Sequence, residues 1–222
     1  MSEAGFRRVL AFDCSGAACS AAVWRDGDVA AERFAAMERG QAETLLPQIQ
    51  AVMAEAGIGF PALEAIATTV GPGSFTGLRL GLSAARGLAL AADVPVLAVT
   101  AFEALLAGLP EEDRKVAVAI DSRRGPVFAQ VFAADRTPLG PPAQLEPDAF
   151  AAWLPADAVL LADQGAALPP GSQPIRTAIR AGDIARLAAS LGPAAIGRLA
   201  PAPLYLRAPD VTMPKNRSVS CS

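Results

Sequence analysis

The sequence GPGSFTGLR at Gly71–Arg79 says the most about the architecture, because it joins an apolar run to a helical pattern with almost no side-chain bulk. Its three glycines permit positive φ angles and leave backbone N–H groups uncovered. Ser74 or Thr76 can cap the helix that follows. A backbone this bare is expected to lie close to either a phosphate group or another protein.

Apolar patterns on both sides of this loop predict the element order βββαβαβα. Short apolar runs predict strands at residues 9–12, 19–24, 29–34, 65–70 and 94–99. Apolar residues at helical spacing predict helices at residues 42–56 and 76–92, and a capping box at Thr100 opens another helix.

The second half of the chain repeats this beginning. Val118–Asp121 resembles Leu10–Asp13, and another apolar run follows each aspartate. The aspartates lie 108 positions apart (121 minus 13), as an internal duplication would place them. The polar stretch 109–115 is the expected boundary, which gives lobes at residues 1–110 and 111–222.

Prolines interrupt the second half, so we expect its lobe to be reduced. A last amphipathic helix is predicted from Asp183, as its N-cap, to Gly192. The division leaves open that the chain end returns to the first lobe.

Histidine is absent from all 222 residues, which removes the commonest general base, the commonest zinc ligand and every Ser-His couple. Cys14, Cys19 and Cys221 lack a C-x-x-C spacing, so neither a disulfide framework nor a metal site is expected. The net charge of −3 argues against a broad nucleic-acid-binding face. Short apolar runs and the lack of a secretion signal predict a cytoplasmic protein.

Asp13 and Asp121 each end an apolar run beside a tight turn, where a carboxylate could hold a metal ion or face a phosphate. The commoner interpretation is that each carboxylate accepts hydrogen bonds from its own turn. The glycine loop matches neither the Walker A pattern nor the dinucleotide fingerprint. The sequence therefore predicts no catalytic residue and at most a weak nucleotide or phosphate contact, from Asp13, Ser15, Gly71, Gly73, Ser74, Thr76 and Arg79.

Small residues recur every four positions along the helix after the loop, at Gly77, Gly81, Ala85 and Ala89. Another helix could pack closely against such a stripe. Packing within the same domain explains the stripe equally well, and the sequence leaves both interpretations open.

Four blocks closely resemble the bacterial TsaB (YeaZ) family, at residues 10–15, 19–24, 43–47 and 71–79. Support continues at residues 87–89, 94–96, 119–123 and 203–207. The resemblance implies an α/β fold of the actin-like ATPase (ASKHA) type, with two RNase H-like lobes built on mixed sheets. It also implies a non-catalytic subunit of the complex that installs threonylcarbamoyl on tRNA adenosine beside the anticodon.

In that family the catalytic paralogue TsaD forms a heterodimer with this subunit, and a small ATPase, TsaE, joins them. The resemblance thus implies tRNA contact only through the complex, no intrinsic cofactor, and ATP or ADP, if present, at the interface of the complex. The family usually has a histidine where this chain has Gln41, which affects any contact that needs a charged ring there.

The stripe and the resemblance together predict a partner interface on two helices, formed by Leu45, Leu46, Ile49, Met53, Gly77, Gly81, Ala85 and Leu88. If so, Ala85→Arg should abolish heterodimerisation and leave the monomer folded.

Three other functions compete with this one. A stand-alone ASKHA-fold phosphotransferase or hydrolase would use Asp13 and Asp121 to hold magnesium. A peptidase would need a mechanism without histidine, for which the sequence offers little. A homodimeric binding module would need only the small stripe.

Overall fold

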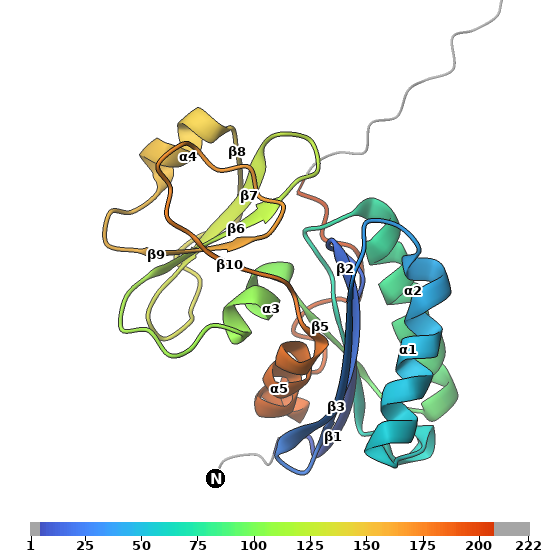
Figure 1. Ribbon diagram of the computed structural model, residues 1–222. Coiled ribbons are helices and arrows are strands. Elements are labelled where there is room, and N and C mark those ends of the chain that lie inside the picture. Colours follow the sequence, from blue (N-terminus) through green and yellow to red (C-terminus); the bar gives the residue numbers. More distant parts are fainter. Residues whose placement is uncertain (1–4, 207–222) are drawn as a thin grey trace, which may run out of the picture.

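The computed structural model describes residues 5–206 in two lobes, each built on one five-stranded sheet (Figure 1). Arg207, in the last block of the resemblance, lies outside the described residues. None of the helices in the described part is long and apolar enough to cross a membrane.

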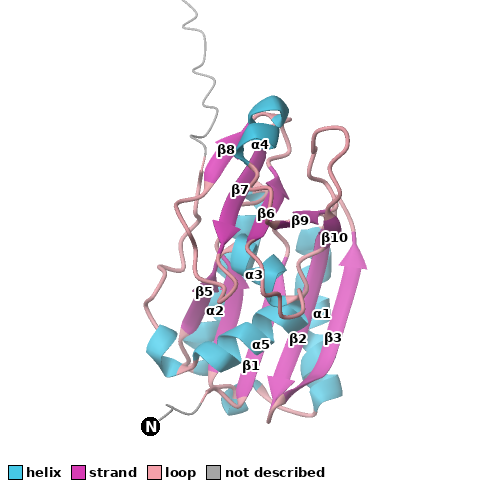
Figure 2. Ribbon diagram, turned by 90° about the vertical axis from the view of Figure 1, so that its left-hand side faces the viewer, coloured by secondary structure: helices cyan, strands magenta, loops and turns pink. Residues whose placement is uncertain are grey.

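The first sheet has the strand order β3-β2-β1-β4-β5, with β3 and β5 at its two edges (Figure 2). Strands β1 to β3 are antiparallel, and Asp26 and Gly27 form their second turn with positive φ angles of 52° and 106°. The helices carry the chain between parallel strands. The elements are β1 (Arg8–Asp13), β2 (Ala18–Arg25), β3 (Asp28–Ala36), α1 (Gln41–Ala56), β4 (Ala65–Thr69), α2 (Phe75–Ala92), β5 (Val96–Val99) and α3 (Ala101–Ala107), with a short 3₁₀ turn η1 (Phe60–Ala62).

This order confirms the predicted βββαβαβα pattern. Gly57 ends α1 in the left-handed conformation, and Thr100 and Glu103 form the predicted capping box of α3. Local chemistry at helix ends was therefore readable from the sequence.

The second sheet has the order β10-β9-β6-β7-β8, which repeats the first order when its strands are counted from β6. Asp121 ends β6 as Asp13 ends β1, so the internal repeat is confirmed. The lobe is reduced because no helix joins β9 to β10, and β8 and β10 have three residues each. The elements are β6 (Val116–Asp121), β7 (Val127–Phe132), β8 (Ala143–Leu145), α4 (Pro147–Trp153), β9 (Val159–Asp163), β10 (Ile175–Thr177), α5 (Ala181–Leu191) and η2 (Pro193–Ala195).

Helices cover both faces of the first sheet. Helices α1 and α2 lie side by side on the outer face, and α3 and α5 lie on the face toward the second lobe (Figure 1). The largest hydrophobic cluster includes Val9 of β1, Phe102 of α3, Ile184 of α5 and Val118 of β6. One continuous core therefore joins the lobes, and α5 contributes to it from the second half of the chain.

The predicted N-cap of α5 is wrong. The helix begins at Ala181, and Asp183 lies in its first turn. Glu32 of β3 accepts the Gly182 N–H at 2.9 Å and pairs with Arg180 at 2.8 Å. A carboxylate 150 residues away in sequence thus accepts a free backbone N–H in the first turn of α5. Local sequence patterns do not reveal such a distant contact.

Candidate functional site

The glycine loop lies against the turn between β1 and β2. A Cβ atom on Gly77 would lie 2.0 Å from the carbonyl oxygen of Cys14, and one on Gly73 would lie 2.9 Å from the carbonyl oxygen of Ser15. The Ser74 N–H donates to that same Ser15 oxygen at 2.7 Å. The expectation that the bare backbone faces a phosphate or another protein is therefore wrong, because it faces the chain's own turn.

The remaining residues of the loop have structural contacts of their own. Ser74 is the N-cap of α2 and accepts the Gly77 N–H at 3.0 Å, whereas Thr76 is exposed. Gly71 has a φ angle of 115°, and its carbonyl oxygen accepts the Ala101 N–H at 2.7 Å. Arg79 lies over the Phe75 ring, with 3.7 Å between the guanidinium carbon and the ring centroid.

A small cavity of about 90 Å³ lies between the lobes. Asp13, Ser15 and Gly73 of the predicted contact set line it, together with Asp121 and Asp163 of the second lobe. Gly71, Ser74, Thr76 and Arg79 are not among its lining residues. Small-molecule sites usually measure about 300–1,000 Å³, so this cavity is too small for a nucleotide.

The Asp13 carboxylate is engaged by its own surroundings. It accepts hydrogen bonds from the Ser15 hydroxyl at 2.7 Å, from the Ser15 N–H at 3.2 Å and from the Thr69 hydroxyl. Burial raises the pKa of Asp13, and these hydrogen bonds partly oppose the shift. The geometry supports the structural interpretation, in which Asp13 fixes its turn.

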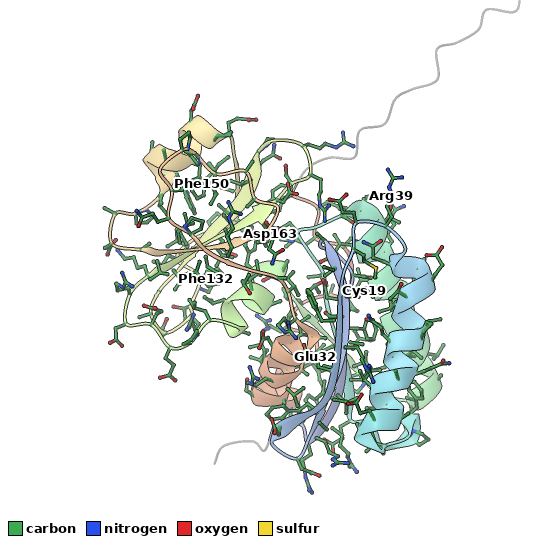
Figure 3. The ribbon with its side chains drawn as sticks, viewed as in Figure 1. Cys19, Glu32, Arg39, Phe132, Phe150 and Asp163 are labelled. Atoms are coloured by element: carbon green, nitrogen blue, oxygen red, sulfur yellow. The ribbon has the colours of Figure 1, made fainter. Side chains whose placement is uncertain are left out.

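Asp163 is a cavity residue that the sequence analysis missed. Both of its carboxylate oxygens lie 3.2 Å from the Asp121 backbone nitrogen, which donates to them. Figure 3 shows Asp163 on the side of the second lobe that faces the first. Burial raises its pKa to about 6, helped by the negative charge of Asp121. Its signal was present, because it ends an apolar strand just as Asp13 and Asp121 do.

The Asp121 carboxylate is held by the turn that follows it. It accepts the Arg123 N–H at 2.7 Å, and the Arg123 guanidinium lies 3.5 Å away. A Cβ atom on Gly165 would lie 2.7 Å from this carboxylate, so the site has little free space on that side. Within residues 5–206, no three side chains of metal-binding type gather into a possible metal site.

The predicted partner interface is largely buried within the first lobe. Leu45, Ile49 and Met53 are at most 4% exposed and pack in the core under α1. The small stripe faces the sheet, where Gly77 touches Cys14 and Gly81 lies near the Thr68 hydroxyl. The interface assignment of these residues is therefore wrong, because their small size lets α2 approach its own strands.

Ala85 is fully buried as well, so the reasoning behind the Ala85→Arg test fails. That variant would place a charge in the core and disrupt folding. Leu46 and Leu88 remain accessible, with Leu46 51% exposed and Leu88 partly buried.

The outer sides of α1 and α2 form one solvent-facing surface, which we call the helical face. Leu46 and Leu90, the latter 86% exposed, are large apolar side chains on this face. Ala42, Leu46, Gln50 and Ala54 are exposed at every fourth position of α1, where Glu43, Pro47 and Glu55 are exposed as well, and the exposed residues of α2 include Ser83, Gly87 and Leu90.

Known proteins resemble this chain along most of its length. The family model for TsaD, described as tRNA N6-adenosine threonylcarbamoyltransferase, matches residues 35–172. The crystallised YeaZ from Pseudomonas aeruginosa is 30% identical, with a TM-score of 0.76 over 90% of this chain and 100% of that one.

Among curated proteins, the Escherichia coli tRNA threonylcarbamoyladenosine biosynthesis protein TsaB is 37% identical over 54% of this chain and 53% of its own length. A Mycobacterium tuberculosis protein of uncharacterised function is 33% identical over 95% of this chain and 96% of its own. The chain spans about half the length of the curated TsaB proteins it matches.

Two sheets of the same unusual order, related by an internal repeat, define a two-lobed protein of the actin-like ATPase (ASKHA) type. Its interlobe cavity is nearly filled by its own turns. The chain belongs to the TsaB (YeaZ) family.

Proposed function

We propose that this chain is a non-catalytic subunit of the complex that installs threonylcarbamoyl on tRNA adenosine beside the anticodon. It forms a heterodimer with a TsaD-like catalytic paralogue and activates it. The observation that carries the proposal is the similarity to YeaZ over nearly the whole chain, together with the match to E. coli TsaB.

The cavity supports the non-catalytic part of this proposal. Asp13 accepts hydrogen bonds from Ser15 of its own turn and from Thr69, and Asp121 is held by Arg123. A stand-alone phosphotransferase of this fold would need room for a nucleotide between the lobes, and about 90 Å³ is too little. Any ATP or ADP of the complex is proposed to bind at the interface between subunits.

The helical face supports the partner-binding part. Leu46 and Leu90 are large apolar side chains exposed to solvent, and the small exposed residues Ser83 and Gly87 of α2 would let a partner helix approach closely. We place the TsaD-like paralogue on this face. A homodimer of the chain is the competing assembly on the same surface.

The other partners follow from this role. A TsaE-like ATPase is proposed to join the assembled pair, and tRNA is proposed to bind through the complex because the chain carries a net charge of −3. A subunit with this role works in the cytoplasm.

Reconstitution tests the proposal. Transfer of threonylcarbamoyl to tRNA is measured with the TsaD-like paralogue and the TsaE-like ATPase, with this chain omitted and then added back. We expect modification only after add-back. Modification at an equal rate without the chain, or turnover by the chain alone, would refute the proposal.

Matched variants locate the docking surface. Leu46→Glu and Leu90→Glu place a charge on the helical face, and Leu139→Glu, at a position 54% exposed in the second lobe, is the control. We expect the first two variants to lose the heterodimer in size-exclusion chromatography with little change in melting temperature, and the control to keep it. Equal retention by all three would remove the helical face as the docking site.

A further inference from the structure

Residues 198–206, which we call the C-terminal strap, run along α2 and are tied to it by specific contacts. The Arg86 guanidinium donates to the Pro201 carbonyl oxygen at 2.6 Å, and the Arg79 Nε donates to the Tyr205 hydroxyl at 3.1 Å. The Leu204 N–H donates to the Val70 carbonyl oxygen at 2.7 Å. The strap and α2 therefore form one composite surface that continues the helical face.

An ordered aromatic stack lies on this surface. The Phe75 and Tyr205 rings stack with 5.4 Å between their centroids, and the Arg79 guanidinium also lies over Phe75. Both rings remain exposed, Phe75 by 44% and Tyr205, the chain's single tyrosine, by 40%. Tyrosine and arginine are enriched among the residues that dominate binding energy at interfaces, and a preformed stack loses little side-chain entropy on binding.

The charges on this surface have one sign. Helix α2 contains Arg79 and Arg86 and no acidic residue between Phe75 and Ala92. The strap adds Arg198, which pairs with Glu103 at 2.7 Å. Among residues 5–206, no carboxylate forms an ion pair with Arg79 or Arg86. Arg79 contacts the Tyr205 hydroxyl and the Phe75 ring, and Arg86 contacts the Pro201 carbonyl oxygen. Two positive charges thus have no carboxylate partner within the described part of a chain that is acidic as a whole.

We propose that the C-terminal strap is part of the partner-docking surface, with Tyr205, Phe75 and Arg79 as its main contact, and that the protein partner presents carboxylates to Arg79 and Arg86. The inference rests on the proposed function and adds the chemistry of the partner's face. A second copy docked with its α2 against this α2 would bring its own arginines against these, which disfavours that form of self-association. The exposed Leu90 on the same helix favours a protein over an RNA, since RNA offers phosphates and bases but little aliphatic surface.

Calorimetric titration of the purified full-length chain with the purified TsaD-like paralogue tests this proposal. We expect Arg79→Glu and Arg86→Glu each to raise the Kd about tenfold or more, because each substitution would place a carboxylate of this chain opposite a carboxylate of the partner. The control Arg114→Glu changes the charge equally at an exposed site before β6 and should shift the Kd less than twofold. Tyr205→Ala should weaken binding, and Tyr205→Phe, which keeps the ring, should weaken it less. Melting temperatures of all variants confirm that the chain is folded.

Salt distinguishes the partner's chemistry. Raising NaCl from about 0.05 M to about 0.5 M should weaken the heterodimer, because attraction between opposite charges is screened. Self-association through the same surface would instead strengthen, because the repulsion is screened. A heterodimer whose Kd is unchanged or lower at high salt would contradict the proposed acidic partner face.

The possible failures can be told apart. If Leu90→Glu weakens the heterodimer while the Arg79, Arg86 and Tyr205 variants bind as the wild type does, the strap is not part of the docking surface and the proposed function stands. If Leu90→Glu also binds normally, docking on the helical face fails as well. If the arginine variants keep the paralogue but lose binding of tRNA by the chain alone, the surface serves RNA and this inference is overturned.

Discussion

Replacing Asp163 with asparagine should stabilise the protein at neutral pH. The carboxyl has a pKa of about 6 in the folded chain against 3.8 ordinarily, chiefly because it is buried. A difference of about 2.2 pKa units (6 minus 3.8), at about 1.36 kcal/mol per unit, corresponds to about 3 kcal/mol. Asparagine cannot ionise, and its amide oxygen can still accept the Asp121 N–H.

The sign follows from proton binding. The folded state holds this proton more tightly than the unfolded chain does, so the contribution to stability is fully present below about pH 3.8 and is lost as the pH rises through about 6. The free energy of unfolding of Asp163→Asn should therefore match the wild type near pH 4 and exceed it by up to about 3 kcal/mol at pH 7.

Urea unfolding of both proteins at pH 4, 5, 6 and 7 measures this difference. Asp157→Asn is the control, because Asp157 is exposed and Lys115 lowers its pKa, so its difference should run in the opposite direction. A difference that does not grow between pH 4 and 7, or a variant less stable than wild type at pH 7, would refute the reasoning. Confirmation would show that the buried Asp163 carboxylate lowers the stability of the folded chain at neutral pH.

Three further predictions concern packing and reactivity. Gly77→Ala should lower the free energy of unfolding, measured in thermal melts, by about 3 kcal/mol or more, because its Cβ would collide with the Cys14 carbonyl. The control Gly87→Ala, at a position with open space around it, should be neutral or stabilising by up to about 1 kcal/mol. Equal effects of the two substitutions would contradict the packing of α2. Glu32→Ala should lower urea stability by about 1–3 kcal/mol, because the amide at the start of α5 and the neighbouring guanidinium lose their acceptor, and an unchanged midpoint would show that this link is unimportant. Cys14 and Cys19 should resist iodoacetamide at pH 8 until the protein is unfolded, since burial raises the pKa of the Cys19 thiol to about 11 and raises that of Cys14 further. Alkylation of either thiol in the folded protein, detected by mass spectrometry, would contradict the structure.

The sequence predicted most of the fold because the signals were local. Turn residues such as Gly57 and the Thr100 capping box act on neighbouring backbone groups, so their roles could be read without a structure. The repeat of Asp13 by Asp121 then predicted the second lobe. The Glu32 contact at the start of α5 escaped prediction because its two ends are far apart in sequence.

The site was less predictable because the spacing of residues along a helix does not determine whether that side of the helix faces the sheet or the solvent. The stripe from Gly77 to Ala89 suits a close helix and a close sheet equally well, and the structure turns it toward the sheet. Leu45, Ile49 and Met53 of α1 likewise face the core, which is the usual outcome for a helical apolar stripe, and only Leu46 of the predicted α1 contacts faces solvent. The pairing of Tyr205 with Arg79 joins segments 126 residues apart, and no periodic pattern could reveal it.

Helix α5 also bears on how the protein is made. It covers the inner side of the first sheet, yet in the chain it begins 74 residues after the end of α3 (181 minus 107). Until residue 191 has emerged from the ribosome, the part of the sheet that α5 covers stays exposed to solvent and offers an apolar surface to other chains. The first lobe can therefore complete its packing only after α5 has been synthesised.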